Sequence, residues 1–492
     1  MSRPIRQVAA ALVLAAVSAC GRTGPQEPAP VAHAPAGPTP LGAAPSAPAW
    51  SARELGTLQS QLRGALGASA LATSGISVVD GNGRPLFARR DRTPMTPAST
   101  FKVLVGAAAL QTLGPDFRFS TTLESVDDAA DGTIRGDVYL VGTGDPLLTR
   151  DDLRGGVAAV ARAGVRDISG AIVADATVFG GAEQNSAWDA DDLQYGYAAG
   201  TSALSLDQGT VEFHLVPTSV GLRARIRVLP PSSAVRVAGG VITSYATLLT
   251  IQRDAARNDF TFSGRVAAGA EQSFWRPVID LPRYAADVAR TMLRERGVKV
   301  EGGVRAGIAP VAPYVLWQHR SPKLRDLVHE MMLESNNHFA EQLLRAVGTT
   351  RGTGTEANGA LVERAILVRG GVPQDGLRIV DGSGLAPSDR VAPLTLAMLL
   401  ARTAVEPAGP LFVGALPRVG IEGTVRWRHL TSARGRTRAK SGHIAHVNAL
   451  AGYVQTRRHG RVAFAFIVND RRADDGPVEI GIDRALDVLA RS

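Results

Sequence analysis

The chain has 492 residues, of which 45 % are hydrophobic and 20 % charged, with a formal net charge of +9 and a single cysteine. This length and apolar content exclude a disordered chain and leave room for about three domains. The 50 arginines are dispersed and not clustered in one helix or arm, so the composition favours no nucleic-acid partner.

The N-terminus predicts a lipoprotein signal peptide over residues 1–20. A basic start is followed by an apolar stretch, residues 8–17, that is too short to span a membrane. Val17-Ser18-Ala19-Cys20 then resembles a bacterial lipobox, in which the cysteine is lipidated and becomes the mature N-terminus. The alternatives are an ordinary signal peptide cleaved near Ala19, or a chance cysteine. No other stretch is long and apolar enough to span a membrane.

Residues 21–49 are rich in Pro, Ala and Gly and predict a linker that joins the membrane anchor to the folded part. Residues 51–66 predict an amphipathic helix, because four leucines recur on one stripe. Residues 76–80 and 84–89, joined by Gly81-Asn82-Gly83, predict a β-hairpin.

A buried helix is predicted next, because the run 103–113 is apolar nearly all round, with Pro97 before it and Gly114-Pro115 after it. Ser99 lies at the first turn, and Lys102 follows three residues later on the same face. Burial lowers the pKa of an amine. An amine with a lowered pKa can act as the base that activates a neighbouring hydroxyl as a nucleophile. The alternative is that Ser99 is only a helix cap. The chain has only four lysines, and arginine cannot release its proton, which favours a function for Lys102.

From about 122 to 315 the pattern changes to short strand-like runs divided by glycines, which predicts one or two inserted, largely β modules. The predicted strands are residues 138–141, 171–174, 211–215 and 224–228. The loop Gly142-Thr143-Gly144-Asp145-Pro146 is not a phosphate loop, because no Lys-Ser/Thr pair follows it.

Helical periodicity returns in the last third of the chain. The predicted helices are residues 324–332, 339–347, 361–368, 394–401 and 480–489, and the predicted strands are 447–454 and 462–468. Asp381-Gly382-Ser383-Gly384-Leu385 predicts a turn. Ser383 lies between glycines, but the spacing of a nucleophile elbow is absent, so a structural turn is favoured.

Three short motifs follow one another in order, and their combination is specific where each alone is weak. They are Ser99-x-x-Lys102, Ser335-x-Asn337 and Lys440-Ser441-Gly442. Together they resemble the motifs of the serine penicillin-recognising enzymes. The turn at 381–385 and the long insertion narrow the resemblance to the class C low-molecular-mass penicillin-binding proteins, which are D-alanyl-D-alanine carboxypeptidases and endopeptidases. The resemblance covers about residue 55 to the C-terminus.

This resemblance implies an α+β fold like that of the serine β-lactamases, in which an antiparallel sheet is flanked by helices. The peptidase domain would be discontinuous, formed by residues 50–121 and 316–492. Residues 122–315 would form the large, mostly β insertion.

The resemblance also implies a role for each matching residue. Ser99 would be the acyl-accepting nucleophile, Lys102 its base, and Ser335 the relay of a proton to the leaving group. The residues implied to bind substrate are Asn337, Lys440, Ser441, Gly442, His443 and, in the insertion, Asp175. Backbone N–H groups of Ser99 and His443 would form the oxyanion hole. Asp175 and Phe179 resemble residues near the substrate's side-chain amine in relatives; the alternative is a surface aspartate and a core phenylalanine.

Two positions depart from the family pattern. The family usually has threonine where Ser441 stands and a small hydroxyl residue where His443 stands, so His443 adds bulk and a possible charge at the cleft edge. A zinc site at His443 and His446 is disfavoured, because no third ligand is apparent nearby. The implied chemistry needs no metal and no other cofactor.

The resemblance implies a serine-type D-Ala-D-Ala carboxypeptidase or endopeptidase that acts on peptidoglycan stem peptides and is inhibited covalently by β-lactams. It would be held in the cell envelope by a lipid anchor in a bacterial membrane, facing the periplasm or the cell exterior. One alternative is a serine β-lactamase, which is disfavoured by the insertion and by the lack of a Glu-x-x-Leu-Asn stretch after Ser335. The other is a non-catalytic wall-binding module, which the presence of Lys102 and Lys440 disfavours.

The lipobox generates the first testable prediction. Cys20→Ala should move the protein from the membrane fraction to the soluble periplasmic or secreted fraction, because stable anchoring needs two or more acyl chains on the N-terminus. Cell fractionation and the mass of the mature N-terminus measure this. A wild-type protein that is already soluble and carries no lipid mass would contradict the prediction.

Overall fold

The computed structural model describes residues 48–68, 71–129, 131–311, 313–470 and 475–492. The predicted signal peptide, Cys20 and nearly all of the predicted linker lie outside the described residues. Within the described ranges, none of the helices has the length and apolar character needed to cross a membrane.

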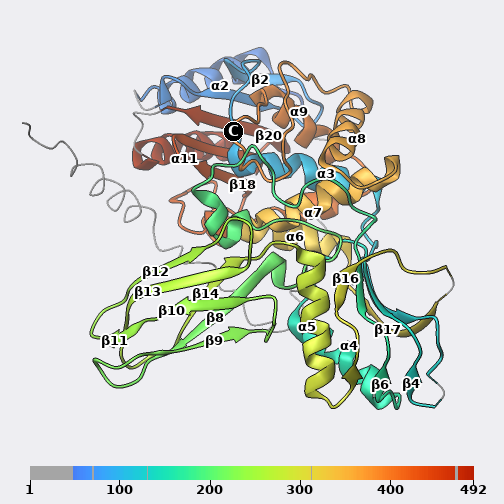
Figure 1. Cartoon of the computed structure of the whole chain (residues 1–492). Helices are drawn as coiled ribbons and strands as arrows, with labels where there is room; N and C mark the ends of the chain where they lie inside the picture. Colours follow the sequence, from blue (N-terminus) through green and yellow to red (C-terminus); the bar gives the residue numbers. More distant parts are fainter. Residues whose placement is uncertain (1–47, 69–70, 130, 312, 471–474) are drawn as a thin grey trace, which may run out of the picture.

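The motif-carrying half is built on a five-stranded sheet that joins the two ends of the chain, in the order β18-β19-β20-β1-β2 (Figure 1). All neighbouring strands in it are antiparallel. The strands are β1 (Gly75–Val79), β2 (Pro85–Arg89), β18 (Thr437–Ile444), β19 (Val447–Gln455) and β20 (Arg461–Asn469). The two predicted hairpins are therefore confirmed, and they meet where β1 pairs with β20.

Helices cover both faces of this sheet. Successive side chains of a strand point to opposite faces, so neighbouring residues of one strand pack against different layers of helices. Phe464 and Phe466 of β20 belong to the core with α2 (Ala52–Ala65) and α11 (Asp475–Arg491). Ala465, between them, belongs to the core on the other face. That second layer contains α3 (Lys102–Thr112), α6 (Leu324–Glu334), α7 (Asn337–Gly348), α8 (Glu356–Arg369), α9 (Pro393–Thr403) and α10 (Gly409–Ala415).

The predicted buried helix is confirmed as α3, whose residues from Lys102 to Leu110 are all buried. A short 3-10 turn, η2 (Ala98–Phe101), precedes it and carries Ser99. The two predicted helices 324–332 and 339–347 are also confirmed as separate helices, because α6 ends at Glu334 and α7 begins at Asn337.

The chain between the first two motifs forms two limbs below this half (Figure 1). One contains a five-stranded sheet in the order β16-β7-β5-β3-β17 and a small sheet β15-β6-β4. Its strands are β3 (Ser120–Ser125), β4 (Thr133–Ile134), β5 (Val138–Gly142), β6 (Asp167–Ile168), β7 (Ile172–Asp175), β15 (Lys299–Val300), β16 (Val304–Ala306) and β17 (Tyr314–Arg320). The other limb contains β8 (Thr210–Val216), β9 (Arg225–Leu229), β10 (Arg236–Gly239), β11 (Ile242–Ser244), β12 (Leu248–Arg253), β13 (Asp259–Ala267) and β14 (Gln272–Pro277).

The insertion also contains two helices that the sequence analysis did not predict, α4 (Arg150–Arg162) and α5 (Leu281–Glu295). Two adjacent glycines in α4 lower its helix propensity. One of them, Gly156, has a packing reason: a Cβ there would lie 2.7 Å from the Trp317 ring on β17.

The sequence boundaries of the insertion, 122 and 315, fall inside β3 and β17, and these two strands pair with each other. We therefore propose 120 and 320 as its ends.

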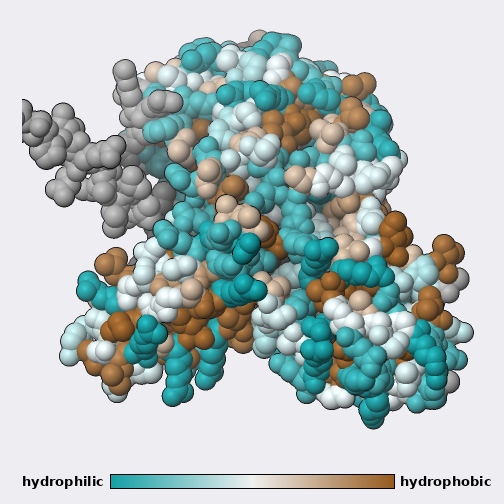
Figure 2. Space-filling view, viewed as in Figure 1, coloured by the Kyte–Doolittle hydropathy of each residue, from teal (hydrophilic) through white to brown (hydrophobic). Residues whose placement is uncertain are grey.

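The limb formed by β8–β14 exposes apolar side chains at its surface (Figure 2). Among them are Leu222, Tyr245 and Leu248, whose exposed fractions are 60 %, 88 % and 62 %. Exposed apolar groups of this kind are typical of contact surfaces.

The close packing of α8 on α7 generates the second prediction. A Cβ at Gly359 would lie 2.2 Å from the Leu344 carbonyl oxygen, so Gly359→Ala should lower the free energy of unfolding by about 1–3 kcal/mol. Gly155→Ala is the matched control. Gly155 is also in a helix, but no atom lies within 4 Å of its Cβ position, so alanine should stabilise by about 0.5–1 kcal/mol.

Thermal unfolding of both variants measures the difference. Equal unfolding temperatures for the two variants would contradict the packing described for α7 and α8.

Candidate active site

Two neighbouring segments approach the Ser99 turn so closely that each needs a glycine. A Cβ at Gly442 of β18 would lie 3.0 Å from Ser99 N. A Cβ at Gly384, whose φ is +77°, would lie 2.0 Å from the Ala98 carbonyl oxygen. The turn is therefore enclosed between β18 and the loop 381–386.

The side chain of Lys102 joins the first motif to the second. Its Nζ donates to Ser99 Oγ at 2.9 Å and to Asn337 Oδ1 at 2.7 Å. It also donates to the Ser383 carbonyl oxygen at 2.9 Å. Lys102 is fully buried, so these three atoms are its described hydrogen-bond partners in place of solvent.

The chemistry of the three partners orients the amine. The Asn337 Oδ1 and the Ser383 carbonyl only accept hydrogen bonds, whereas a serine hydroxyl can also donate one. A neutral amine has two protons and one lone pair. If both protons go to the two pure acceptors, the lone pair points at Ser99 Oγ.

The electrostatics favour the neutral amine. Burial lowers the pKa of Lys102 to about 7, and the carboxyls of Asp381 and Glu341 oppose part of that shift. A substantial fraction of the amine is therefore unprotonated near neutral pH. A low-pKa amine that contacts a serine hydroxyl has the arrangement of a nucleophile and its base.

The second motif lies at the junction of α6 and α7. Ser335 adopts a left-handed conformation, with φ of 59°, and ends α6. The Asn336 side chain caps α7 by accepting from Phe339 N at 3.1 Å. Asn337 Nδ2 donates to the Tyr197 carbonyl oxygen at 2.9 Å, and its second proton remains for another acceptor.

The third motif lies on β18 beside the Ser99 turn. Lys440 is fully buried, and its Nζ donates to the Ser441 carbonyl oxygen at 2.7 Å. Burial, and then the charge of Lys102, lower its pKa well below the ordinary value, while Glu334 opposes the shift. The Ser441 hydroxyl is hydrogen-bonded to the Thr424 hydroxyl at 2.8 Å. These two hydroxyls, and not the Lys440 amine, are accessible at this edge.

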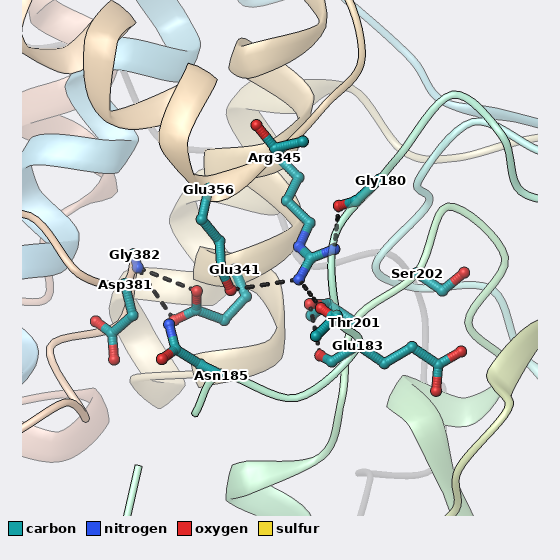
Figure 3. Close-up of polar contacts among 12 residues, drawn as sticks. Gly180, Glu183, Asn185, Thr201, Ser202, Glu341, Arg345, Glu356, Asp381 and Gly382 are labelled. Carbon is teal, nitrogen blue, oxygen red and sulfur yellow. Dashed lines mark hydrogen bonds and ion pairs between the residues drawn. The ribbon is translucent and has the colours of Figure 1, made fainter. Parts of the chain in front are cut away.

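The insertion contributes directly to the frame of the site. Trp188 Nε1 donates to Asp381 Oδ2 at 2.8 Å, and Tyr197 supplies the carbonyl that binds Asn337. Arg345 of α7, which is 2 % exposed, donates to the Gly180 carbonyl at 2.9 Å and also pairs with Glu356 (Figure 3). The segment from 180 to 208 is thereby fixed to α7.

Asp175, the predicted site residue in the insertion, makes no described hydrogen bond to the residues around Ser99. The described hydrogen bonds of Asp175 go to Thr177 and to Ala309 N, the latter at 2.7 Å. Asp175 is 7 % exposed, so the alternative of a surface aspartate is wrong, while Phe179 does lie in the core. A role for Asp175 toward substrate stays a prediction.

His443 is about half exposed, and its Nδ1 lies 3.7 Å from Asp475 Oδ1. In the described part of the chain, no three His, Cys, Asp or Glu side chains form a group suited to a metal ion.

Sequence reasoning missed several groups that contact the motif residues. Ser383 is fully buried and its hydroxyl stays within its turn, as expected, but its carbonyl binds Lys102. A sequence pattern cannot predict this contact, because every residue has a backbone carbonyl. Thr424, which pairs with Ser441, also carried no signal. Glu341 lies one turn after Asn337, in a helix whose residues from His338 to Gly348 are all buried.

Comparisons with known proteins identify a family and several relatives. A family described as the D-Ala-D-Ala carboxypeptidase 3 (S13) family matches residues 58–491. A D-alanyl-D-alanine carboxypeptidase of Actinomadura sp. (strain R39) is 32 % identical over 441 residues, covering 85 % of this chain and 81 % of that protein. The D-alanyl-D-alanine carboxypeptidase DacB of Haemophilus influenzae is 28 % identical, covering 78 % and 82 %.

A solved structure is similar over the same range. The crystal structure of penicillin binding protein 4 from Haemophilus influenzae has a TM-score of 0.77 and 26 % identity, covering 88 % of this chain and 99 % of that one. A second structure of that protein, complexed with a β-lactam, has a TM-score of 0.72 and 25 % identity, with the same coverage.

The low pKa of Lys102 generates the third prediction. If the neutral amine activates Ser99, the rate of Ser99 acylation by a fluorescent β-lactam should rise about tenfold per pH unit below pH 7 and level off above it. Stopped-flow measurement between pH 5 and 9 tests this. An acylation rate that is independent of pH, or that rises only toward pH 10, would show that Lys102 is an ordinary charged lysine.

Proposed function

The chain belongs to the D-Ala-D-Ala carboxypeptidase 3 (S13) family and is a serine-type carboxypeptidase of the penicillin-binding-protein class, and on this premise we propose how its residues carry out the reaction. The observation that carries the proposal is the set of three contacts around the Lys102 amine. They leave the lone pair of the neutral amine directed at Ser99 Oγ.

In the first half-reaction, Ser99 Oγ attacks the carbonyl carbon of the D-Ala–D-Ala peptide bond while Lys102 takes its proton. The negative charge forms on the carbonyl oxygen, which the backbone N–H groups of Ser99 and His443 would stabilise. The close approach of Gly442 to Ser99 N supports this pairing of the two segments.

The proton then passes from Lys102 through the Ser335 hydroxyl to the nitrogen of the leaving D-alanine. The C–N bond breaks and an ester remains on Ser99. Water attacks that ester in the second half-reaction, with Lys102 again as base, and releases the shortened peptide and free Ser99. The position of Ser335 at the junction of α6 and α7, two residues from Asn337, supports this role.

The remaining residues would hold the substrate. The second Nδ2 proton of Asn337 is suited to a backbone carbonyl of the peptide. The hydroxyls of Ser441 and Thr424 would bind the terminal carboxylate, and an arriving carboxylate would favour the charged form of the buried Lys440 amine behind them. Ser441 thus supplies the hydroxyl for which the family usually uses threonine.

We further propose that the same site cleaves peptide cross-links as a DD-endopeptidase, because that reaction also transfers a D-alanyl acyl group to the serine, with the amine of the cross-linked stem peptide as the leaving group that takes the proton. Peptidoglycan stem peptides are the proposed substrates and β-lactams the covalent inhibitors. A lipid anchor on Cys20 and a position in the cell envelope remain proposals that rest on the lipobox pattern.

The fourth prediction tests the nucleophile and base. Ser99→Ala should abolish release of D-alanine from a pentapeptide ending in D-Ala–D-Ala. Lys102→Arg should lower release about 10²–10⁴-fold, because arginine keeps the charge but stays protonated. Lys299→Arg is the matched control, since Lys299 is an exposed lysine that pairs with Glu301, and its activity should equal that of the wild type.

Liquid chromatography of the products and mass mapping of the β-lactam adduct supply the readouts. Near-normal release by a folded Lys102→Arg protein would refute the base assignment. An adduct on a serine other than Ser99 would refute the nucleophile assignment.

A further inference from the structure

The loop that carries the Ser383 carbonyl is held by two buried carboxylates. Glu341 Oε1 accepts from Ser383 N at 2.8 Å and from Gly382 N at 3.1 Å. Asp381 Oδ1 accepts from Gly384 N at 2.6 Å. Figure 3 shows the Glu341 side chain extending from α7 toward Gly382, with Asp381 beside it. The orientation of the Ser383 peptide therefore depends on these two side chains.

The same helix holds Lys102 in two ways. Asn337, at the start of α7, contacts the amine directly. Glu341 lies one turn further along the same face of α7 and contacts the loop whose Ser383 carbonyl accepts from the amine. Both pure acceptors of the Lys102 protons are thus placed by α7, one through a side chain and one through two backbone N–H groups.

We propose that Glu341 is a positioning residue for acylation of Ser99: it orients the Ser383 carbonyl so that the Lys102 lone pair points at Ser99 Oγ. This inference rests on the proposed roles of Ser99 and Lys102. Glu341 makes no described hydrogen bond to the nucleophile or the base and positions the amine through the peptide of Gly382 and Ser383. Its charge also raises the pKa of Lys102, so removing that charge favours the neutral amine and cannot itself slow acylation.

The surroundings of Glu341 make a carboxyl group at this position energetically unfavourable. It is 1 % exposed, and the acidic groups near it come from the loop and from α8, namely Asp381, Asp389, Glu356 and Glu363. Burial, and then the charge of Asp381, raise the pKa of Glu341 to about 8. Burying a carboxyl group beside other carboxyl groups costs free energy unless the group makes hydrogen bonds that an apolar side chain could not make. The N–H groups of Gly382 and Ser383 supply such bonds.

Glu363 offers a matched control in the same cluster. It lies on α8, is also 1 % exposed, and burial raises its pKa well above the ordinary value. Among the described residues, however, neither of its carboxyl oxygens has a hydrogen-bond partner. Glu363→Gln therefore makes the same chemical change in the same cluster without touching the loop that binds Lys102.

The test separates the acylation rate constant of a fluorescent β-lactam from its non-covalent dissociation constant in the full-length protein. Glu341→Gln keeps one acceptor oxygen but replaces the other, which lies 3.1 Å from Gly382 N, with an N–H₂ that cannot accept and that faces this donor. A displacement of the Ser383 carbonyl should then lower the rate constant about ten- to a hundredfold. The dissociation constant should stay within about twofold, because Glu341 does not touch the ligand. Glu363→Gln should acylate at the wild-type rate.

Equal rate constants for Glu341→Gln and Glu363→Gln, whether normal or reduced, would overturn the inference. So would a loss for Glu341→Gln that appears only in the dissociation constant. If Glu341→Gln does not fold, Glu341→Asp replaces it, because the shortened side chain keeps the carboxyl group but withdraws from the loop, and the same loss in rate is expected. A wild-type protein that is not acylated at Ser99 would refute the proposed function itself, a result distinct from these.

Discussion

A lysine amine that is buried without solvent must find partners within the protein, and this constraint organises the structure around Lys102. Burying the amine disfavours its charged form, and the three acceptors around it fix its direction. Two of these acceptors come from parts of the chain more than 230 residues away in sequence. The fold of the motif-carrying half brings these groups to Lys102, because α3 packs against α6, α7, α8 and α9.

The insertion takes part in this arrangement although it lies outside the central sheet. Its segment from 180 to 208 supplies the Tyr197 carbonyl to Asn337 and the Trp188 indole to Asp381. Both recipients belong to the frame that holds Lys102, so the placement of the insertion is coupled to the geometry of the Lys102 amine. Tyr195 and Tyr197 stack at 5.5 Å between ring centroids and are 42 % and 48 % exposed, which places aromatic surface beside the second motif.

Much of the fold was predictable from local pattern. The apolar run after Ser99, the hairpins and the helix break at Ser335 all follow from periodicity and from turn residues, and each is confirmed. The helices α4 and α5 were missed, the former because its glycines mask the pattern. For the site, the three motifs indicated which side chains meet. The sequence could not indicate the Ser383 and Tyr197 carbonyls, because every residue has such a group and only the tertiary fold selects which one is used.

The central claim is that the pKa of the Lys102 amine lies near 7, so that a substantial fraction of it is unprotonated at physiological pH, and this can be measured directly because the chain has only four lysines. The protein is labelled with lysine carrying ¹⁵N at Nζ, the spectra are recorded as a function of pH, and the Lys102 signal is assigned by its loss in Lys102→Arg. We expect a titration midpoint near 7 for this signal, whereas the exposed Lys299, beside Glu301 and Asp167, has a pKa above the ordinary lysine value. A Lys102 signal that remains that of an ammonium group up to pH 10 would contradict the account.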